Sequence, residues 1–281
     1  MRPDLSTVGH QTEAFRFEYG FRDTILYALG VGALADELDY LYEGRGPRVL
    51  PSFAVVPAYA PVVHLFEKTR CDLTRLVHHT QTVRVHRPFP PSALVETVGR
   101  VQGIYDMKRL ALVVFETRTT LAGELLAETE WSMLIRDAGG FDGPRPPRTE
   151  QPKIPEGATP AFDIALPTTR EQALLYRLSG DYNPLHADPE FAARAGFAEG
   201  PILHGLATFG VMTRALLKHL GKAPLRVTGL GAQFRRPVWP GETLRTTGFA
   251  LGEGRFALEV FAAERPDPVI TNAWASVGSS S

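Results

Sequence analysis

The chain of 281 residues has a single cysteine, Cys71, and almost no net charge, with 30 Lys and Arg against 31 Asp and Glu. One cysteine excludes an intrachain disulfide and a zinc site built from several cysteines, and it is compatible with a reducing compartment. A net charge of -1 provides no general attraction for nucleic acid or for an anionic membrane, so we expect neither partner. An anionic ligand must be recognised by local groups.

Long apolar runs are also absent. No stretch of 18 uncharged apolar residues occurs, so no membrane-spanning helix is expected, and the first 15 residues lack the apolar segment of a secretion signal. The last three residues are serines and not the peroxisomal address SKL. We therefore expect a cytoplasmic globular protein, and 44% hydrophobic residues suffice for a sizeable core.

Proline is concentrated in one segment, GGFDGPRPPRTEQPKIPEGATP, at residues 139–160. Proline interrupts regular helices and central strands. The segment therefore predicts a linker at residues 144–160, between an N-terminal domain at residues 1–143 and a C-terminal domain at residues 161–281. Each domain is long enough for one small core.

The two halves share similar residues at a constant offset of 149 positions. At this offset Tyr27 coincides with Tyr176, Gly99 with Gly248, and an Arg-Pro pair near residue 87 with another near residue 236. These identities fall at the same turns and strand ends, which indicates an internal duplication.

Apolar, β-branched runs separated by turn residues occur in both halves. The predicted strands are residues 94–101, 110–117 and 125–135, and then 227–234, 243–251, 255–263 and 269–277. Each set predicts an antiparallel meander. Apolar residues at helical spacing over 204–220 predict one long helix across a sheet, with Ala207 and Gly210 allowing close packing on the sheet and Gly221 as the C-cap.

A carboxylate and an imidazole, Asp181 and His186, occur together in the segment SGDYNPLH. Pro184 ends the preceding helical pattern and Gly180 permits an unusual backbone angle, so a rigid loop can bring the two side chains together. Asn183 can brace this loop through bonds to nearby backbone. Such a pair on one water molecule could provide the proton transfers that hydration of an activated alkene requires. By spacing alone, a solvated loop or a helix cap is the alternative.

A second feature precedes the predicted helix, in the segment Gly200-Pro-Ile-Leu-His-Gly-Leu206. The N–H groups near Gly205 and Leu206 would lie at the positive end of that helix. Hydration of an enoyl thioester builds negative charge on the thioester oxygen, which fixed N–H donors stabilise. Gly205 has no side chain to block this oxygen, although glycine is also common at helix starts.

These residues carry a resemblance to a known family. The stretch Tyr176-Arg-Leu-Ser-Gly-Asp-Tyr-Asn-Pro-Leu-His186, followed by ADP and later by GPILHGL, resembles the signature of the MaoC-like, or hydratase 2, family of (R)-specific enoyl-CoA hydratases. The N-terminal half resembles the first domain of the two-domain members in TILYALGVGA and in its tryptophan-containing strand. The resemblance implies an α+β fold of the double hot-dog type, two curved antiparallel sheets each wrapped on a helix, with the N-terminal helix reduced.

The resemblance also implies the reaction, hydration of trans-2-enoyl-CoA to (R)-3-hydroxyacyl-CoA in fatty acid β-oxidation. By it, Asp181 and His186 are the catalytic pair, Asn183 supports them, and the Gly205 N–H is the oxyanion donor. Which of the pair first removes the proton from water stays open, because the two groups can titrate as a unit.

Further residues are predicted to contact the acyl-CoA substrate. They are Tyr182, Pro184, His204, Leu206, Arg235 and Arg236. The two arginines lie near a strand end and can bind a phosphate of coenzyme A, although an exposed strand-end charge is an equal alternative. Acyl-CoA brings its own thioester and nucleotide, so neither a metal nor a redox cofactor is required. His78 and His79 point to opposite faces of a strand, which argues against a metal site there.

The N-terminal half lacks the acid-base pair. At the 149-residue offset Asp181 coincides with Gly32 and His186 with Glu37. We therefore expect one active site per chain, with the N-terminal half as a binding wall. A reduced N-terminal helix would leave room for a bulky acyl tail, lined by residues 51–61 (PSFAVVPAYAP), or these residues could simply pack in the core.

Other functions are compatible with parts of this pattern. A biosynthetic 3-hydroxyacyl thioester dehydratase would run the same chemistry in reverse. A thioesterase fits the fold, although the intact DYNPLH loop argues against it, and a non-catalytic acyl-CoA-binding protein would not require the acid-base pair. We also expect a homodimer.

Overall fold

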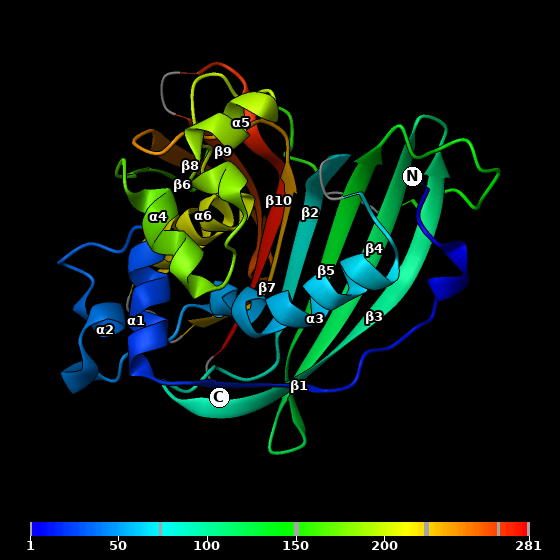
Figure 1. The fold of residues 1–281 in the computed structure, drawn as a ribbon. Coiled ribbons are helices and arrows are strands. Elements are labelled where there is room, and N and C mark those ends of the chain that lie inside the picture. Colours follow the sequence, from blue (N-terminus) through cyan, green and yellow to red (C-terminus); the bar gives the residue numbers. More distant parts are fainter. Residues whose placement is uncertain (1, 73–74, 149–151, 222–224, 263–264, 280–281) are drawn as a thin grey trace.

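The computed structural model describes residues 2–72, 75–148, 152–221, 225–262 and 265–279. The strands of the first half are β1 (Phe15–Tyr19), β2 (Leu76–Val85), β3 (Ala93–Met107), β4 (Leu110–Leu121) and β5 (Glu124–Arg136). Those of the second half are β6 (Phe162–Pro167), β7 (Leu225–Phe234), β8 (Thr243–Gly252), β9 (Arg255–Ala262) and β10 (Pro268–Ser279). All belong to one ten-stranded antiparallel sheet, in the order β1-β3-β4-β5-β2-β7-β10-β9-β8-β6 (Figure 1).

The strand order supports the predicted duplication. Counted from either outer edge, each half contributes its first, third, fourth, fifth and second strand. The two halves meet where β2 pairs with β7, with Thr82 opposite Gly231. The expected strands are confirmed, with ends that differ by a few residues and with residue 263 outside the described residues. Strands β1 and β6 were not predicted, and a strand at β2 was expected only around His78 and His79, without bounds.

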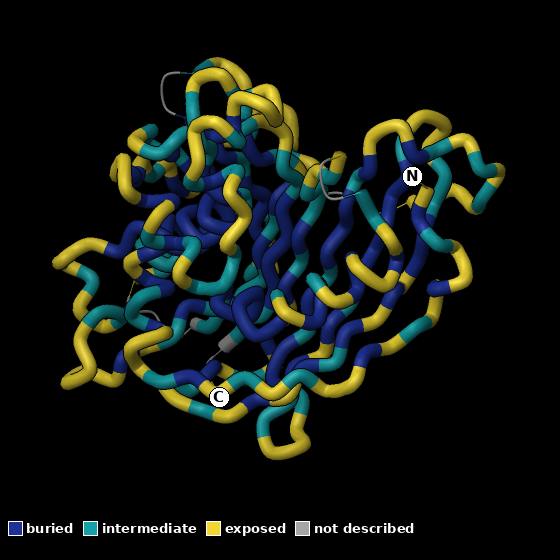
Figure 2. The backbone as a smooth tube through the Cα atoms, in the orientation of Figure 1, coloured by how far each residue is buried: buried dark blue, intermediate teal, exposed yellow. Residues whose placement is uncertain are grey.

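Two long helices lie against the sheet, α3 (Val55–Lys68) in the first half and α6 (Gly205–Leu220) in the second (Figure 1). The shorter helices are α1 (Phe21–Gly30), α2 (Leu38–Leu41), α4 (Gln172–Tyr176) and α5 (Pro189–Arg194). The short 3-10 helices are η1 (Leu5–Thr7), η2 (Glu43–Arg45), η3 (Pro51–Ala54), η5 (Arg177–Ser179) and η6 (Pro184–His186). Each half therefore wraps its part of the sheet around one helix, and the expected double hot-dog fold is confirmed. Buried stretches of the chain lie along α6 and along the strands of both halves (Figure 2).

The expectation of a reduced N-terminal helix is wrong. Helix α3 has 14 residues, close to the 16 of α6, although it contains Pro57 and Pro61. Pro57 is in the first turn, where no helical N–H bond is lost, and Pro61 packs over Gly99. A Cβ atom at Gly99 would lie 3.1 Å from Cβ of Pro61, so glycine makes room for the helix. Most of residues 51–61 accordingly pack in the core.

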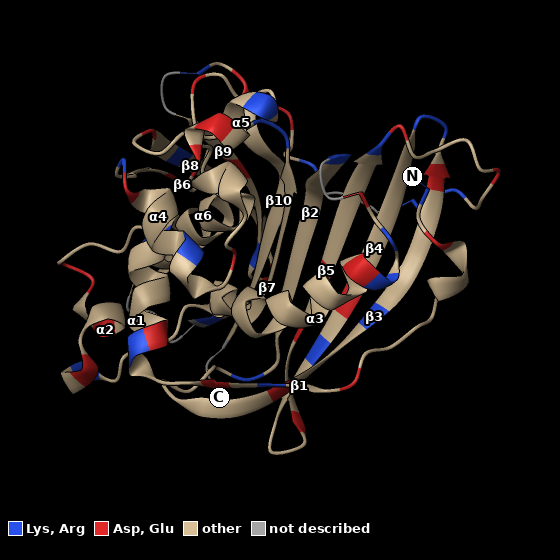
Figure 3. Cartoon of the chain, viewed as in Figure 1, with Lys and Arg blue, Asp and Glu red and all other residues tan. Residues whose placement is uncertain are grey.

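The described residues between β5 and β6 form neither helix nor strand. This agrees with the prolines there, while the domain limits at residues 143 and 161 stay predictions. Within the described ranges, no helix is long and apolar enough to cross a membrane. Charges of both signs are mixed along the loops and helix ends visible in Figure 3, as the balanced composition predicts.

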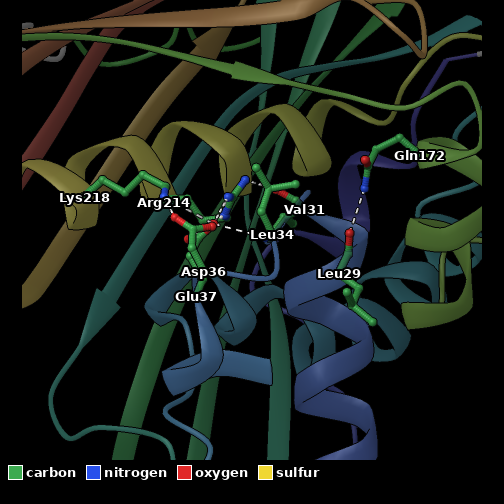
Figure 4. A network of polar contacts seen from close by, with 8 residues as sticks. All are labelled: Leu29, Val31, Leu34, Asp36, Glu37, Gln172, Arg214 and Lys218. Atoms are coloured by element: carbon green, nitrogen blue, oxygen red, sulfur yellow. Dashed lines mark hydrogen bonds and ion pairs between the residues drawn. The ribbon is translucent and has the colours of Figure 1, made fainter. Parts of the chain in front are cut away.

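Buried polar contacts join the two halves beside α6 (Figure 4). The Arg214 guanidinium donates to both carboxylate oxygens of Glu37 and to the carbonyl oxygen of Val31, the latter at 3.1 Å. The Gln172 side chain donates to the carbonyl oxygens of Leu29 and Gly30 at the end of α1, at 2.8 and 2.7 Å. These bonds fix α1 and the start of α2 against the second half.

Gly210 packs on the end of α1 and not on the sheet, which corrects the expectation from sequence. A Cβ atom there would lie 2.3 Å from Cγ1 of Val31, which is fully buried just after α1. The Gly221 C-cap is confirmed, with a φ of 60° and an N–H bond to the carbonyl oxygen of Leu217 at 3.0 Å.

Gly210→Ala should therefore lower the free energy of unfolding. Overpacking costs about 1–3 kcal/mol, and the better helix propensity of alanine returns about 0.5–1 kcal/mol. We expect a net loss of about 1–2 kcal/mol in urea denaturation. The loss should be partly recovered in Gly210→Ala/Val31→Ala, because the second change removes Cγ1, the nearest clashing atom, although Cβ of residue 31 stays close. A Gly210→Ala protein more stable than the parent would contradict this contact.

Candidate active site

The Asp181–His186 loop is closed by its own polar groups. The Asn183 carboxamide oxygen accepts from the Leu185 N–H at 3.0 Å and caps η6, and the Asn183 N–H donates to Oδ1 of Asp181 at 3.2 Å. Gly180 has a φ of 125°, a conformation that favours glycine. The bracing expected of Asn183 is thus present in the geometry.

Residues 202–204 hold the two ends of this loop together. Nδ1 of His186 donates to the carbonyl oxygen of Ile202 at 2.8 Å, and Nε2 of His204 donates to that of Asp181 at 3.2 Å. The two imidazole rings stack with 3.7 Å between their centroids. Side-chain ligand atoms of Asp181, His186 and His204 all lie within 4.8 Å of one another. The structure therefore brings Asp181 and His186 together.

Burial sets the charge of both histidines. It lowers the pKa of His186, although the Asp181 charge and the bond to Ile202 oppose the shift. It also lowers the pKa of His204 well below the usual range, and the neighbouring His186 adds to this effect. A carbonyl oxygen can only accept, so the proton of neutral His186 is on Nδ1. Nε2 of His186 is then a lone-pair acceptor, as a general base requires.

The start of α6 presents backbone N–H groups, those of Gly205 and Leu206, that have no acceptor among the described residues. The first backbone bonds to the His204 carbonyl oxygen come from Ala207 and Thr208, at 3.0 and 3.2 Å. The Gly205 and Leu206 N–H groups precede them, and the first N–H groups of a helix have no intrahelical acceptor. A Cβ atom at Gly205 would lie 3.3 Å from the Phe234 ring, so a side chain there would crowd this position.

The first half contributes Tyr59, from the segment 51–61 expected to line the acyl tail or to pack in the core, and His78, considered from sequence only as a metal ligand. The hydroxyl of Tyr59, on α3, donates to Oδ1 of Asp181 at 2.8 Å. His78 on β2 stacks on Trp131 at 5.4 Å and contacts the Phe234 ring at 4.8 Å, both measured between ring centroids. Burial lowers the pKa of His78 to about 4, partly opposed by its bond to the backbone and by the Asp181 charge. The N-terminal half of the chain thus contributes these side chains to the surroundings of the loop.

The neighbouring His79 contacts a different side chain, because its Nε2 lies 3.2 Å from Nε2 of the Gln233 carboxamide. His78 and His79 thus diverge as alternation along a strand predicts. No local signal marks Tyr59, because its partner is 122 residues away in the chain. Alternation of side chains along the strand could have predicted that His78 faces inward. It could not have predicted that His78 lies near Asp181.

Four of the predicted substrate contacts belong to the loop and to the start of α6. Tyr182 is 58% exposed, and Pro184 is also exposed. His204 and Leu206 are buried, at 1% and 5% exposure, which favours a packing role. Contact of these residues with substrate stays a prediction.

The two arginines at the end of β7 differ from each other. Arg236 pairs with Asp267 at 2.6 Å, whereas Arg235 is exposed and forms no ion pair within the described part of the chain. Arg235 directly follows Phe234, whose ring covers Gly205, so its backbone lies near the start of α6. Binding of a coenzyme A phosphate by either arginine stays a prediction.

The three clustered groups also have the composition of a metal site. Imidazole lone pairs lie in the ring planes, however, and the rings of His186 and His204 stack with 27° between their planes. Nearly parallel stacked rings do not direct both lone pairs to one ion, as tetrahedral ligation requires. Each ring also uses one nitrogen for a backbone carbonyl. The arrangement suits hydrogen bonding better than metal binding.

Comparison with known proteins identifies both halves. Residues 152–272 match the MaoC like domain and residues 17–137 the MFE-2 hydratase 2 N-terminal domain. The chain is 40% identical to 3-hydroxyacyl-thioester dehydratase Y of Mycobacterium tuberculosis, over 94% of each chain. It is 36% identical to the peroxisomal enoyl-CoA hydratase 2 of Arabidopsis thaliana, over 85% of this chain and 84% of that protein.

A solved structure agrees with these relatives. The MaoC-like dehydratase from Phytophthora capsici superimposes with a TM-score of 0.86 at 26% identity, over 98% of each chain. Sequence and fold thus match over almost the whole length. The chain belongs to the MaoC-like, or hydratase 2, family of hydro-lyases.

Proposed function

We propose that the chain hydrates trans-2-enoyl-CoA to (R)-3-hydroxyacyl-CoA, with Asp181 and His186 as the acid-base pair on a bound water. The observation that carries the proposal is the convergence of a carboxylate and a buried imidazole of lowered pKa beside the start of α6. Membership of the hydratase 2 family supports the substrate class and the (R) configuration.

The geometry suggests how the reaction proceeds. A water between Asp181 and His186 loses a proton to the pair while its oxygen bonds to C3 of the enoyl group. The alkene electrons move towards the thioester oxygen, where the Gly205 N–H stabilises the enolate. A proton from the pair then bonds to C2, so one water is added and no net proton is consumed. No metal or redox cofactor takes part in this proposal.

Dehydration of a 3-hydroxyacyl thioester uses the same groups in reverse. The relative named 3-hydroxyacyl-thioester dehydratase Y makes this the second candidate function. The cellular compartment and the oligomeric state of the chain stay predictions. A cytoplasmic homodimer is expected from the sequence, while the Arabidopsis relative is named peroxisomal.

The hydration assay tests the proposal directly. Purified protein should bleach the ultraviolet absorbance of enoyl-CoA substrates without releasing free thiol, and activity should survive dialysis against EDTA. The product should be oxidised by an (R)-specific 3-hydroxyacyl-CoA dehydrogenase and not by an (S)-specific one. Thiol release would show a thioesterase, and binding without turnover a carrier. Substrates with short, long and sterol-like acyl chains would define the acyl specificity.

A further inference from the structure

One contact links the N-terminal half to the Asp181 carboxylate. Tyr59 lies on α3, and its hydroxyl donates to Oδ1 of Asp181 at 2.8 Å. The other bonds described above for Asp181 and His186 come from the C-terminal half itself. The proposed acid-base pair is therefore held by groups from both halves, although its motif belongs to only one.

Tyr59 is placed to act as a fixed donor. Burial raises its pKa far above the usual range, and the neighbouring Asp181 charge adds to this, so the hydroxyl keeps its proton. The ring centroid lies 6.4 Å from that of Trp131 on β5. The Cδ1 atom of Tyr59 lies 3.9 Å from the place of a Cβ on Gly180, against the loop. The side chain is thus packed between the sheet and the loop.

The hydrogen bond from Tyr59 restricts the orientation of the Asp181 carboxylate. Oδ1 accepts from both the Tyr59 hydroxyl and the Asn183 N–H. Two donors on one oxygen fix the rotation of the carboxylate and leave Oδ2 for a water shared with His186. We infer that Tyr59 is a positioning residue, which orients Asp181 for proton transfer. This inference depends on the proposed function.

The competing explanation is structural: the Tyr59–Asp181 hydrogen bond would only hold the two halves together. The Tyr59 hydroxyl is not needed for that purpose, because α3 is held by its buried apolar face. The buried residues of this face include Ala58, Val62, Leu65 and Phe66. Removing one hydroxyl from a half-buried ring should leave this packing in place.

The test compares Tyr59→Phe with Tyr19→Phe. Tyr19 lies on β1 and donates to the carbonyl oxygen of Pro90 at 3.1 Å, so it matches the chemical change without involving the carboxylate. Tyr59→Phe should lower kcat for enoyl-CoA hydration about tenfold, since a bond to a charged group is lost. KM should change by less than about twofold, because the substrate is not the partner. Tyr19→Phe should keep the parental kcat.

A double variant separates positioning from structure. Tyr59→Phe added to Asp181→Asn should cause no further loss of kcat, since the hydroxyl acts through that carboxylate.

Two results would overturn the inference. One is a Tyr59→Phe protein with the parental kcat. The other is a loss of the same factor when Tyr59→Phe is added to Asp181→Asn as when it is added to the parent. If Asp181→Asn itself retains full activity, it is the proposed function that fails.

Discussion

Asp181→Asn should lower kcat for enoyl-CoA hydration by on the order of a hundredfold or more while the protein stays folded. The carboxamide cannot take a proton from water, but its oxygen can still accept from the Tyr59 hydroxyl and the Asn183 N–H. The loop therefore keeps its shape, and the loss measures proton transfer and charge. Circular dichroism and the melting temperature would check the fold, and the enoyl-CoA assay would give kcat and KM.

His186→Ala should cause a loss of similar size, because it removes the lone pair of Nε2. This change also removes the bond to Ile202 and the stack on His204, so some loss of stability is expected as well. Groups that act as a unit are not additive in their effects on rate. The double variant Asp181→Asn/His186→Ala should therefore be little slower than the slower single variant.

Asp188→Asn is the matched control for these two variants. Asp188 lies close to His186 in the chain but has a structural task, because its Oδ1 accepts from the N–H groups of Glu190 and Phe191 at 2.8 and 3.3 Å and caps α5. Asparagine caps helices equally well. Asp188→Asn should keep the parental kcat. Parental activity in Asp181→Asn or His186→Ala would place the reaction at another site.

The fold was predictable wherever one element carries a clear period or turn residues. Strands β3 to β5 and β7 to β10 and helix α6 were expected for this reason. Helix α3 was not, because Pro57 and Pro61 oppose a helix locally. Its stability comes from burial of its apolar face and from the room that Gly99 leaves for Pro61, both of which depend on a strand distant in sequence.

The site residues likewise divide into those that a local motif marks and those that only the folded chain brings together. Asp181, Asn183, His186 and Gly205 are contained in two short motifs, so sequence could select them. Tyr59 comes from the half that has no such motif, and its bond exists only once α3 packs beside the loop. The 149-residue offset between the halves marked one further position, Glu37. It aligns Glu37 with His186, but it could not show what Glu37 does.

Glu37→Ala should lower the free energy of unfolding by about 3–5 kcal/mol, because it leaves a buried cation without its partner. The side chains of Arg214, on α6, and Glu37 are 1% and 8% exposed, and both carboxylate oxygens of Glu37 accept from the guanidinium. Glu37 also accepts from the Leu34 N–H at 3.1 Å, so the change loses a loop bond as well. Urea denaturation with a fixed protein concentration would measure the difference.

The control is an ion pair of the same chemistry near the surface. Arg245 and Asp163 lie 3.3 Å apart with side chains 42% and 44% exposed, and water can solvate either charge after the other is removed. Asp163→Ala should therefore cost about 0–1 kcal/mol. An equal cost for Glu37→Ala and Asp163→Ala would show that burial of the Arg214 pair contributes little.

Replacing both buried charges separates the value of the pair from the cost of breaking it. In Glu37→Leu/Arg214→Met no charge is left unpaired, and two apolar side chains of similar length can fill the space, so most of the loss should be recovered. A double variant as unstable as Glu37→Ala would instead show that the bonds to Val31 and Leu34 hold α1 and α2 in place. In either case the position that aligns with the proposed catalytic histidine of the second half serves, in the first, to join the two halves.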